Sequence, residues 1–450
     1  MNMKKILCVG LSLFAWVWTS AQEFESAAEA VANMKLGWNL GNTLDSNSGD
    51  LENMWIEMWT DRRPVDYESA WGQPVTRPEL FKLFKDAGFN AVRVPVTWYP
   101  HMEAKFDTEL KWNPDADPIG TQIQSDWMKR VREVVDYVIA QDMYCIINIH
   151  HDTGAATTHW LVAGEDEYAA QHERFEAVWT QIAEEFKDYG EHLLFEGYNE
   201  MLDPYDSWCF ASFATQSKYN STVATSAYNA INSYAQSFVD AVRATGGNNA
   251  TRNLIVSTYG ACSGEGTWNS HLQDPLKQMK LPADDKEGHI IFEIHSYTGL
   301  SSGLSSAKSS VNKMMTAVKT NLASKGAPVI FGEWGTDNGE DYDNRRDNMA
   351  AFLRHFVEQA KANDFGTFYW MGLSDGAHRS VPEFNQPELV EAIVKGYYGD
   401  AGYGAITDVY GEDAEEAEYY DVLGRRHATP VSGLNIVRMT DGSIRKIVKP

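Results

Sequence analysis

Eight short runs of apolar, β-branched and aromatic residues recur along the 450-residue chain, separated by longer stretches in which apolar residues have helical spacing. Strands that are almost continuously apolar and alternate with helices indicate a parallel sheet covered on its outer face. Eight such units predict an α/β fold of the closed (β/α)8 TIM-barrel type. The predicted strands are Leu36–Leu44, Ala91–Val96, Tyr144–His150, Leu193–Glu200, Asn253–Tyr259, His289–Tyr297, Pro328–Trp334 and Thr367–Leu373.

Helices are predicted in the connections, where apolar residues recur at i, i+3, i+4 and i+7. An open doubly wound sheet is the structural alternative, but Gly37 and Gly41 lie within the first strand and form no phosphate-binding loop after it. The segment 100–125 is predicted to be irregular. The predicted helices are Glu79–Ala87, Asp126–Ala140, Gln171–Tyr189, Ala227–Thr245, Trp268–Met279, Ser305–Ser324 and Tyr342–Asn363.

The N-terminus is typical of a signal peptide. Lys4 and Lys5 precede an apolar run from Ile6 to Trp18, and small residues lead to a cleavage pattern after Ala21. A membrane anchor is the alternative, but this run is too short to span about 30 Å of hydrocarbon. We therefore expect residues 1–21 to be removed and the protein to be exported, to the extracellular space or the cell surface.

The C-terminus differs in charge from the rest of the chain. The barrel, as a catalytic domain over residues 22–398, should end near Tyr398, because residues 399–418 contain seven acidic residues and no basic one. That composition predicts a solvated linker. Residues 419–450 are basic and contain two strand-like runs, Tyr419–Leu423 and Leu434–Met439. About 30 residues are too few for an independent core, so we expect a short β tail.

The net charge of −25 disfavours nucleic acid as a partner and favours a neutral substrate. Three cysteines follow the signal peptide. Cys145 lies in a strand and should be a buried thiol, whereas Cys209 and Cys262 fall in loops on one barrel face and leave a disulfide open. The cysteine and histidine spacings resemble no zinc site. We also expect no cofactor.

Polar residues end most of the predicted strands. Chemistry in this fold takes place at the C-terminal ends of the strands, so these residues should line the barrel mouth. A single charged residue there could be a paired core ion, but six such positions at one rim indicate a functional site. They are Arg93, His150 with His151, Asn199 with Glu200, His295 with Tyr297, Glu333 and Trp370.

Glu200 and Glu333 should face each other across the mouth, because their strands lie on opposite sides of the barrel. Paired carboxyl groups are what glycoside hydrolysis requires: a protonated one assists the leaving oxygen and an ionised one attacks or activates water. Their separation, which decides between retention and inversion, is not readable from the sequence. A carboxylate–metal or Schiff-base barrel enzyme is the alternative, although no lysine ends a strand.

The neighbouring residues suggest roles. Arg93 would keep one carboxylate ionised and Tyr297 would donate to it, while Asn199 would bind a sugar hydroxyl. His150 and His295 would supply further donors, and Trp370 would offer a ring face to the sugar. Stacking candidates in or near the loops are Trp38, Trp98 and Trp208, then Trp71, Trp160, Trp268 and Trp334, and weaker candidates for substrate contact are His101 and His151.

Five segments resemble motifs of glycoside hydrolase family 5, and the likeness covers residues 32–398. The segments are Leu36–Asp45, Phe89–Pro95, Ile147–Asp152, Phe195–Glu200 and Ile330–Trp334. The resemblance implies a retaining enzyme with Glu200 as acid/base and Glu333 as nucleophile, acting without a metal. It also places the family's shared active-site set on Arg93, His150, Asn199, Glu200, His295, Tyr297, Glu333 and Trp370.

The first motif and the stretch His192–Gly197 look closest to the branch of endo-β-1,4-glucanases, or cellulases, that includes enzymes acting on xyloglucan and mixed-linkage glucan. We therefore expect a monomeric enzyme with a β-glucan polysaccharide as substrate. Alternatives are a mannan- or xylan-specific hydrolase of the same fold and a non-catalytic glycan-binding protein. One departure is Met201-Leu202 after Glu200, where many members have proline, and it concerns specificity on the leaving-group side.

The tail resembles the C-terminal sorting segment of the type IX secretion route of Bacteroidetes. The resemblance rests on residues 420–426, Pro430, the stretch 433–437 and the basic end, with Asn435 where an aromatic residue is usual. It implies a secretion apparatus as a partner. A small ribbon docked on the barrel is the alternative.

Overall fold

The computed structural model describes residues 24–449 apart from 51–52, 103–119, 212, 216–217, 337–341, 411–415, 422–424, 428, 432 and 440–443. The predicted signal peptide and most of the irregular segment 100–125 lie outside the described residues. In the described part, no helix is both long enough and apolar enough to cross a membrane.

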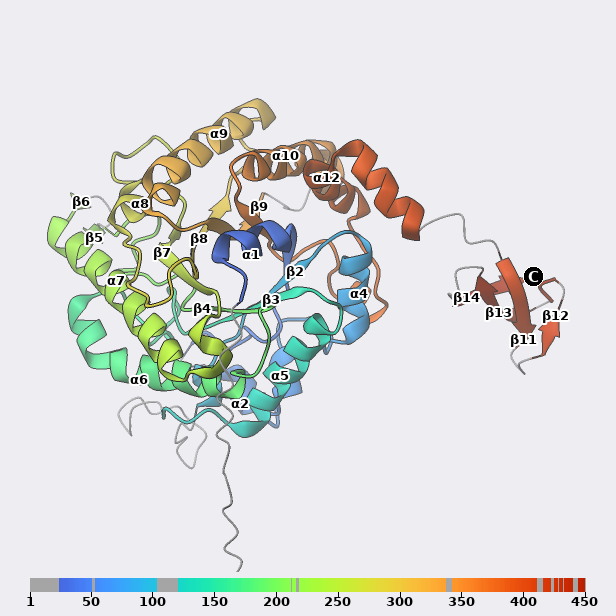
Figure 1. Ribbon diagram of the computed structural model, residues 1–450, viewed down its shortest axis with the longest axis horizontal. Coiled ribbons are helices and arrows are strands. Elements are labelled where there is room, and N and C mark those ends of the chain that lie inside the picture. Colours follow the sequence, from blue (N-terminus) through green and yellow to red (C-terminus); the bar gives the residue numbers. More distant parts are fainter. Residues whose placement is uncertain are drawn as a thin grey trace, which may run out of the picture.

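Eight parallel strands close a barrel (Figure 1), in the spatial order β1-β10-β9-β8-β7-β4-β3-β2. The predicted (β/α)8 fold is confirmed, and every strand begins within one residue of its predicted start. Several strands end earlier than predicted, because the following residues leave the sheet to form the loops of the barrel mouth. The strands are β1 Leu36–Asn39, β2 Ala91–Val94, β3 Tyr144–Asn148, β4 Leu193–Glu196, β7 Leu254–Cys262, β8 Ile290–Tyr297, β9 Val329–Gly335 and β10 Gly366–Tyr369.

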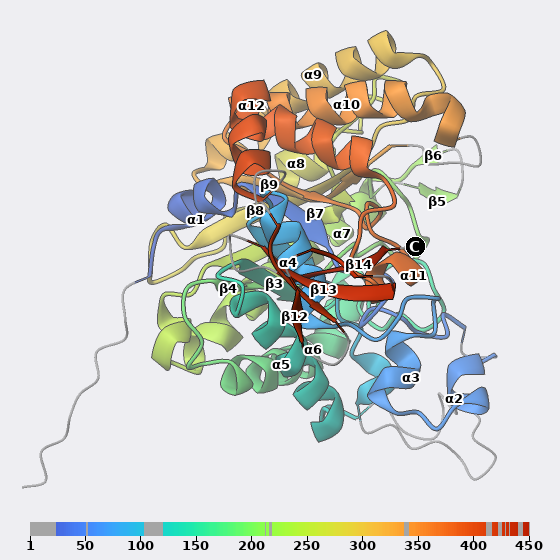
Figure 2. The ribbon, with the colours of Figure 1, turned by 90° about the vertical axis from the view of Figure 1, so that its right-hand side faces the viewer.

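The longer helices lie around the outside of the barrel (Figures 1 and 2), and their apolar faces cover the strands. All seven predicted helices are present; α8 is shorter than expected, and shorter helices occur in the loops. The helices are α1 Ala27–Met34, α2 Trp55–Trp59, α3 Pro64–Glu68, α4 Pro78–Asp86, α5 Ser125–Ile139, α6 Glu165–Glu185, α7 Ser221–Ala244, α8 Asp274–Gln278, α9 Leu304–Asn321, α10 Tyr342–Ala362, α11 Ala377–Ser380 and α12 Pro387–Tyr410.

Helix α1 closes the N-terminal end of the barrel. Ser26 and Glu29 form a capping box that starts the helix. The buried face of α1, including Ala30 and Met34, packs on a layer of apolar side chains that the strands direct into the barrel. This dry layer is formed by Ala91, Tyr144, Ile146, Leu194, Ile255, Ile291, Ile330 and Phe368.

A polar layer lies two residues further along several of these strands. Because successive side chains of a strand point to opposite faces, residues two apart share the barrel interior. Arg93 thus follows Ala91, Glu196 follows Leu194, and Glu293 follows Ile291. All three charged side chains are completely buried. The alternation of inward and outward side chains along the strands therefore places a charged layer between the apolar layer and the mouth of the barrel.

The C-terminal residues form a separate antiparallel sheet in the order β12-β11-β13-β14, as the predicted short β tail implied. Its strands are β11 Glu416–Asp421, β12 Arg426–His427, β13 Gly433–Met439 and β14 Ile444–Lys449. The remaining strands, β5 Phe213–Thr215 and β6 Lys218–Tyr219, form a small hairpin in the connection after β4.

The expected linker over residues 399–418 differs from the structure at both ends. Helix α12 continues through residues 400–410 after a break at Gly399, whose φ is 75°, and β11 already begins at Glu416. The Arg354 guanidinium pairs with Asp400 at 3.0 Å and ties the second part of the helix to α10. Of the seven acidic residues, only Asp400 and Asp408 lie in this part of the helix, and alanine, which has the highest helix propensity, occurs between them.

Candidate active site

Arg93, on β2, is the centre of the polar layer. Its Nε and Nη2 donate to the two carboxylate oxygens of Glu196 at 2.6 and 2.7 Å, which fixes the plane of the guanidinium. The remaining nitrogen, Nη1, then donates to Glu333 at 2.9 Å and to the Asn39 side chain at 3.0 Å. A fixed guanidinium can hold several carboxylates at once in a way that lysine cannot. The floor of the site is therefore rigid.

Glu333, on β9, is held from two sides. Its Oε1 accepts from Arg93, and its Oε2 accepts from the Tyr297 hydroxyl at 2.5 Å. Burial raises the pKa of the Glu333 carboxyl above its ordinary value, while His295 and Arg93 act in the opposite direction. Both hydrogen bonds favour the ionised form and leave this carboxylate oriented toward the mouth.

Glu200, in the loop after β4, lies beside His295 of β8. Its Oε1 is 2.8 Å from His295 Nδ1, and the same ring nitrogen is 3.6 Å from Glu333 Oε2. One oxygen of Glu200 and one of Glu333 lie within 4.8 Å of each other. The Glu200 side chain is 24% exposed and the Glu333 side chain only 5%, so Glu200 is the more accessible carboxyl. Two carboxyl groups thus face one small space.

His150, at the end of β3, has a tautomer fixed by its neighbour Asn148. The Asn148 amide oxygen accepts from the Val96 N–H, so its nitrogen donates to Glu196 at 2.8 Å and to His150 Nδ1 at 3.0 Å. His150 Nε2 therefore carries the proton and lies 3.8 Å from Glu333 Oε1. Burial and nearby cations lower the pKa of His150 well below its ordinary value, so the ring is a neutral donor.

Asn199 and Trp370 complete the predicted set. The Asn199 side-chain oxygen accepts from Arg93 Nη2 at 2.8 Å, which turns its amide nitrogen away from the guanidinium. The Trp370 ring stacks on the His150 ring with centroids 5.8 Å apart and planes 12° from parallel. All eight residues of the predicted active-site set therefore lie at one mouth of the barrel.

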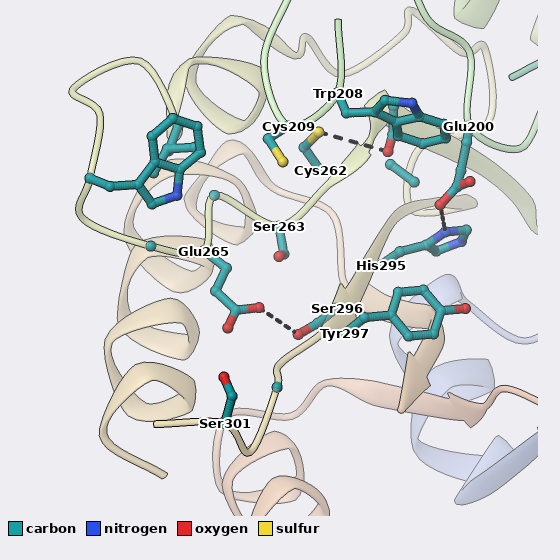
Figure 3. A pocket seen from close by; sticks show the side chains of 17 residues that line it. Glu200, Trp208, Cys209, Cys262, Ser263, Glu265, His295, Ser296, Tyr297 and Ser301 are labelled. Carbon is teal, nitrogen blue, oxygen red and sulfur yellow. Dashed lines mark hydrogen bonds and ion pairs between the residues drawn. The ribbon is translucent and has the colours of Figure 1, made fainter. Parts of the chain in front are cut away.

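A cavity of about 640 Å³ opens beside Glu200 and His295. Figure 3 shows Glu200 and His295 directed toward one another on one side, with Glu265 and Ser296 on the other. Trp208, which is 46% exposed, lines this cavity beside Glu200, as expected for a stacking residue. Trp268, which is 68% exposed, also lines it.

The predicted substrate contacts of Trp38 and Trp98 are wrong, because these side chains belong to the core, as does the further candidate Trp334. Trp38 is completely buried and stacks on Phe84, with ring centroids 4.0 Å apart. Strand alternation is the cause: Asn39 points into the barrel, so its neighbour Trp38 points outward. Trp98 is also buried, with its ring nitrogen donating to the Asn148 carbonyl. Trp334 is buried against Phe356.

Of the two histidine candidates, His101 lies in the core and His151 lies at the rim of the barrel. His101 is buried and stacks on Trp127 with ring centroids 3.5 Å apart, so it is a core residue and not a rim residue. The His151 side chain is 33% exposed, lies 3.8 Å from an Asp45 oxygen, and packs against Trp71 near His150. His151 therefore remains a candidate for substrate contact at the rim.

Glu196 and Glu293 were missing from the sequence-based set. Glu293 Oε1 lies 2.5 Å from His295 Nε2, on the opposite side of the ring from Glu200. The signal was present, because Glu293 is an acidic residue two positions before His295 in a strand that is otherwise apolar. Because residues two apart in a strand point to the same side, strand alternation would have placed Glu293 on the inner face of the barrel together with His295.

The three cysteines in the described part of the chain are free thiols. Cys145 is buried in β3, as predicted. Cys209 lies in the connection after β4, whereas Cys262 is the last residue of β7 and not a loop residue as expected. Both line the cavity (Figure 3), without a disulfide between them. Burial raises the pKa of both thiols, which keeps them protonated and weakly reactive at neutral pH.

The donor atoms of Glu200, His295 and Glu333 lie close enough together to suggest a metal site. However, the Arg93 guanidinium is only 2.9 Å from Glu333 and both nitrogens of His295 face carboxylates. These contacts already supply positive charge to the carboxylates. The arrangement suits proton transfer and nucleophilic attack by carboxyl groups.

Comparison with protein families shows which family this chain belongs to. The model of the cellulase family, glycosyl hydrolase family 5, matches residues 56–375. The chain belongs to glycoside hydrolase family 5. The chain is thus a glycoside hydrolase, and the resemblance to family 5 seen in the sequence motifs is confirmed.

Relatives within family 5 match most of the chain. Endoglucanase B of Neocallimastix patriciarum is 30% identical over 414 residues, which cover 88% of this chain and 76% of that protein. Among solved structures, a broad-specificity endoglucanase of subfamily 4 from an uncultured bacterium is 52% identical, with a TM-score of 0.76, covering 84% of this chain and 97% of that one.

A further solved relative is the family 5 enzyme of Prevotella bryantii. A variant of that enzyme, in complex with a xyloglucan tetradecasaccharide, is 37% identical to this chain with a TM-score of 0.69. The match covers 84% of this chain and all of that one.

Proposed function

We propose that this family 5 enzyme is a retaining endo-β-1,4-glucanase in which Glu200 is the acid/base and Glu333 the nucleophile. One observation carries the assignment: oxygens of the two carboxyl groups approach within 4.8 Å of each other. Retaining enzymes have carboxyl groups about 5 to 5.5 Å apart, whereas inverting enzymes need room for an intervening water.

The exposure and the hydrogen bonds of the two glutamates indicate which is the nucleophile and which is the acid/base. Glu333 is buried and oriented by Arg93 and Tyr297, as suits a group that attacks one fixed carbon atom. Glu200 is more exposed and borders the cavity, where a leaving sugar would lie. The acid must reach an oxygen that departs, and so it needs the accessible side.

The reaction follows in two displacements. Glu333 attacks the anomeric carbon while Glu200 protonates the glycosidic oxygen, which breaks that bond and forms a glycosyl ester. Glu200, now ionised, takes a proton from water, and the resulting hydroxyl displaces Glu333 with overall retention. Neutral His150 and the Asn199 amide supply donors to the hydroxyl groups of the sugar bound between them.

The substrate class rests on the relatives and on the cavity. Proteins named endoglucanase match this chain over most of its length, and the relative from the uncultured bacterium is named as having broad specificity. A xyloglucan oligosaccharide is the ligand of the Prevotella bryantii variant. We therefore include xyloglucan and mixed-linkage glucan beside cellulose-type β-glucan as substrates.

Export is part of the proposal. The charge and apolar pattern of residues 1–21 support a signal peptide, and the tail motifs support recognition by a type IX secretion apparatus. The tail contains a four-stranded antiparallel sheet, which is a folded element of the kind a receptor could bind. We propose that the enzyme acts outside the cell as a monomer.

The test compares carboxymethylcellulose, xyloglucan, mixed-linkage glucan, mannan and xylan as substrates, following reducing ends and viscosity together. A rapid fall in viscosity on the glucans supports internal cleavage of β-glucans. Activity confined to mannan or xylan would overturn the substrate, and no activity on any polysaccharide would favour a binding protein.

The roles of the two glutamates are tested with Glu200→Ala and Glu333→Ala, each supplied with azide and an activated aryl cellobioside. Azide should give a β-glycosyl azide with the first variant and an α-glycosyl azide with the second, because only the second lacks the covalent intermediate. Exchange of these two products would reverse the assignment.

A further inference from the structure

We propose that Glu293 is a positioning residue that holds His295 as the proton partner of Glu200. In this arrangement a proton moves between His295 Nδ1 and Glu200 Oε1. The N–H bond breaks and its electron pair stays on the nitrogen as the O–H bond of Glu200 forms. The inference rests on the proposed role of Glu200 as acid/base.

The first argument is the geometry of the imidazole ring. Its Nδ1 lies 2.8 Å from Glu200 Oε1, and its Nε2 lies 2.5 Å from Glu293 Oε1. A neutral imidazole has only one N–H, so it cannot donate to two ionised carboxylates. One additional proton must therefore lie on the line from Nδ1 to Glu200, either on the ring or on the carboxyl.

The second argument is that the fold provides a fitted place for the Glu293 carboxylate. The side chain is completely buried, and the Ser257 hydroxyl on β7 donates to its Oε2. On β9, Gly332 lies directly beside it, and a Cβ atom at that position would come within 1.9 Å of Glu293 Oε1. Only glycine leaves room for this carboxylate, so its position is built into two neighbouring strands.

The third argument is the charge around His295. Carboxylates face the ring from three elements: Glu293 on β8, Glu333 on β9 and Glu200 after β4. Arg93 on β2 lies 3.9 Å from Glu293, and the titratable residues near His295 in the described part of the chain include His150 and Cys262, which is the β7 strand partner of His295. Burial alone would lower the pKa of His295, but Glu293, Glu333 and Glu200 raise it well above its ordinary value.

Of the three carboxylates that face His295, Glu293 is the one whose charge does not change during the proposed reaction. Burial opposes its ionisation, yet His295 and Arg93 lower the pKa of Glu293 below the ordinary value for glutamate. Glu200 changes its protonation state and Glu333 becomes an ester during the proposed reaction, whereas Glu293 stays ionised. It therefore keeps Nε2 protonated, and Nδ1 directed at Glu200, throughout the cycle.

The consequence is measurable on the alkaline limb of the pH–rate profile. Departure of a sugar needs the proton that His295 and Glu200 share, and the negative charge of Glu293 keeps that proton bound at higher pH. An opposite charge at contact distance moves such a protonation equilibrium by about one to three pH units. Without it, activity on a glucan should be lost at lower pH.

The experiment measures kcat/KM against pH for the full-length protein and for Glu293→Gln, with mixed-linkage glucan and 2,4-dinitrophenyl β-cellobioside as substrates. For the glucan, we expect the alkaline limb to move to lower pH by about one unit or more. The limb should hardly move for the dinitrophenyl glycoside, because its leaving group departs without a proton. An unmoved limb for the glucan, or equal losses on both substrates, would overturn the proposal.

The matched control is Glu196→Gln, which removes another fully buried carboxylate; among the described residues its hydrogen-bond partners include Arg93 and Asn148 and do not include His295. It should slow both substrates and leave the alkaline limb in place. A shift equal to that of Glu293→Gln would mean that any buried charge suffices, and would overturn the specific role. If the wild-type protein had no activity on glucan, the proposed function itself would be wrong.

A second measurement uses the wild-type protein and does not depend on whether Glu293→Gln folds. In protein labelled with ¹⁵N-histidine, with the His295 signals assigned through His295→Asn, Nε2 should remain protonated from pH 5 to 9. An unprotonated Nε2 at neutral pH would overturn the proposal, because Glu293 would then not be its acceptor.

Discussion

Arg93 and Glu196 form a bidentate ion pair in which both side chains are completely buried, with N–O distances of 2.6 and 2.7 Å. The pair occupies two nitrogens of the guanidinium and leaves the third for Glu333. The orientation of the proposed nucleophile thus depends on a residue that does not touch it.

Replacing Arg93 with lysine should lower kcat/KM on glucan about a hundredfold, because an ammonium group cannot hold both glutamates and a misplacement of about 1 Å costs this much. The control is Arg132→Lys, at an exposed pair with Glu185, which should leave the rate unchanged. A rate for Arg93→Lys within threefold of wild type would contradict the positioning argument.

Gly332→Ala should destabilise the protein by about 1 to 3 kcal/mol, because the added methyl group overlaps the Glu293 carboxylate. Urea unfolding measures the change. Gly190→Ala is the matched control, since a Cβ at that position meets nothing within 4 Å, and it should be neutral or slightly stabilising. Equal stabilities of the two variants would show that the carboxylate can move aside.

Trp208→Ala should weaken catalysis on glucan while leaving the fold intact, because the ring is half exposed and borders the cavity beside Glu200. A lost stacking contact of about 1.4 kcal/mol corresponds to a tenfold fall in kcat/KM. An aryl cellobioside, which has no sugar on the leaving side, serves as the control substrate. Equal losses on both substrates would place Trp208 elsewhere in the cleft.

His101 should make the protein sensitive to acid. Burial lowers its pKa well below the ordinary value, so the unfolded chain binds the proton first and stability falls as the pH drops below about 6.5. In His101→Phe, the loss of unfolding free energy between pH 6.5 and 5 should be smaller by about 1 to 2 kcal/mol. An unchanged loss in His101→Phe would show that His101 does not cause the sensitivity to acid.

The sequence predicted the strands well because each is a short apolar run with polar residues where it meets the mouth. It predicted the eight rim residues by their place at strand ends, and all eight lie at the mouth. Trp38 was assigned wrongly because aromatic character was given more weight than strand alternation, which makes Asn39 the inward residue.

The buried partners were harder to predict. Glu196 and Glu293 lie inside the barrel, where an acidic residue is stable only beside a cation from another strand. That cation, Arg93, is more than a hundred residues from Glu196 along the chain. Only the closed barrel shows that one guanidinium serves both Glu196 and Glu333.

The polar layer described above contains more negative groups than positive ones. Around Arg93 and His295 the structure places four carboxyl groups: Glu196, Glu200, Glu293 and Glu333. Cleavage of a glycosidic bond passes through an oxocarbenium-like state, in which positive charge develops on the sugar ring. A buried excess of carboxylates favours that state over the neutral ground state, and it disfavours sugars that carry a carboxylate of their own, such as uronic acids.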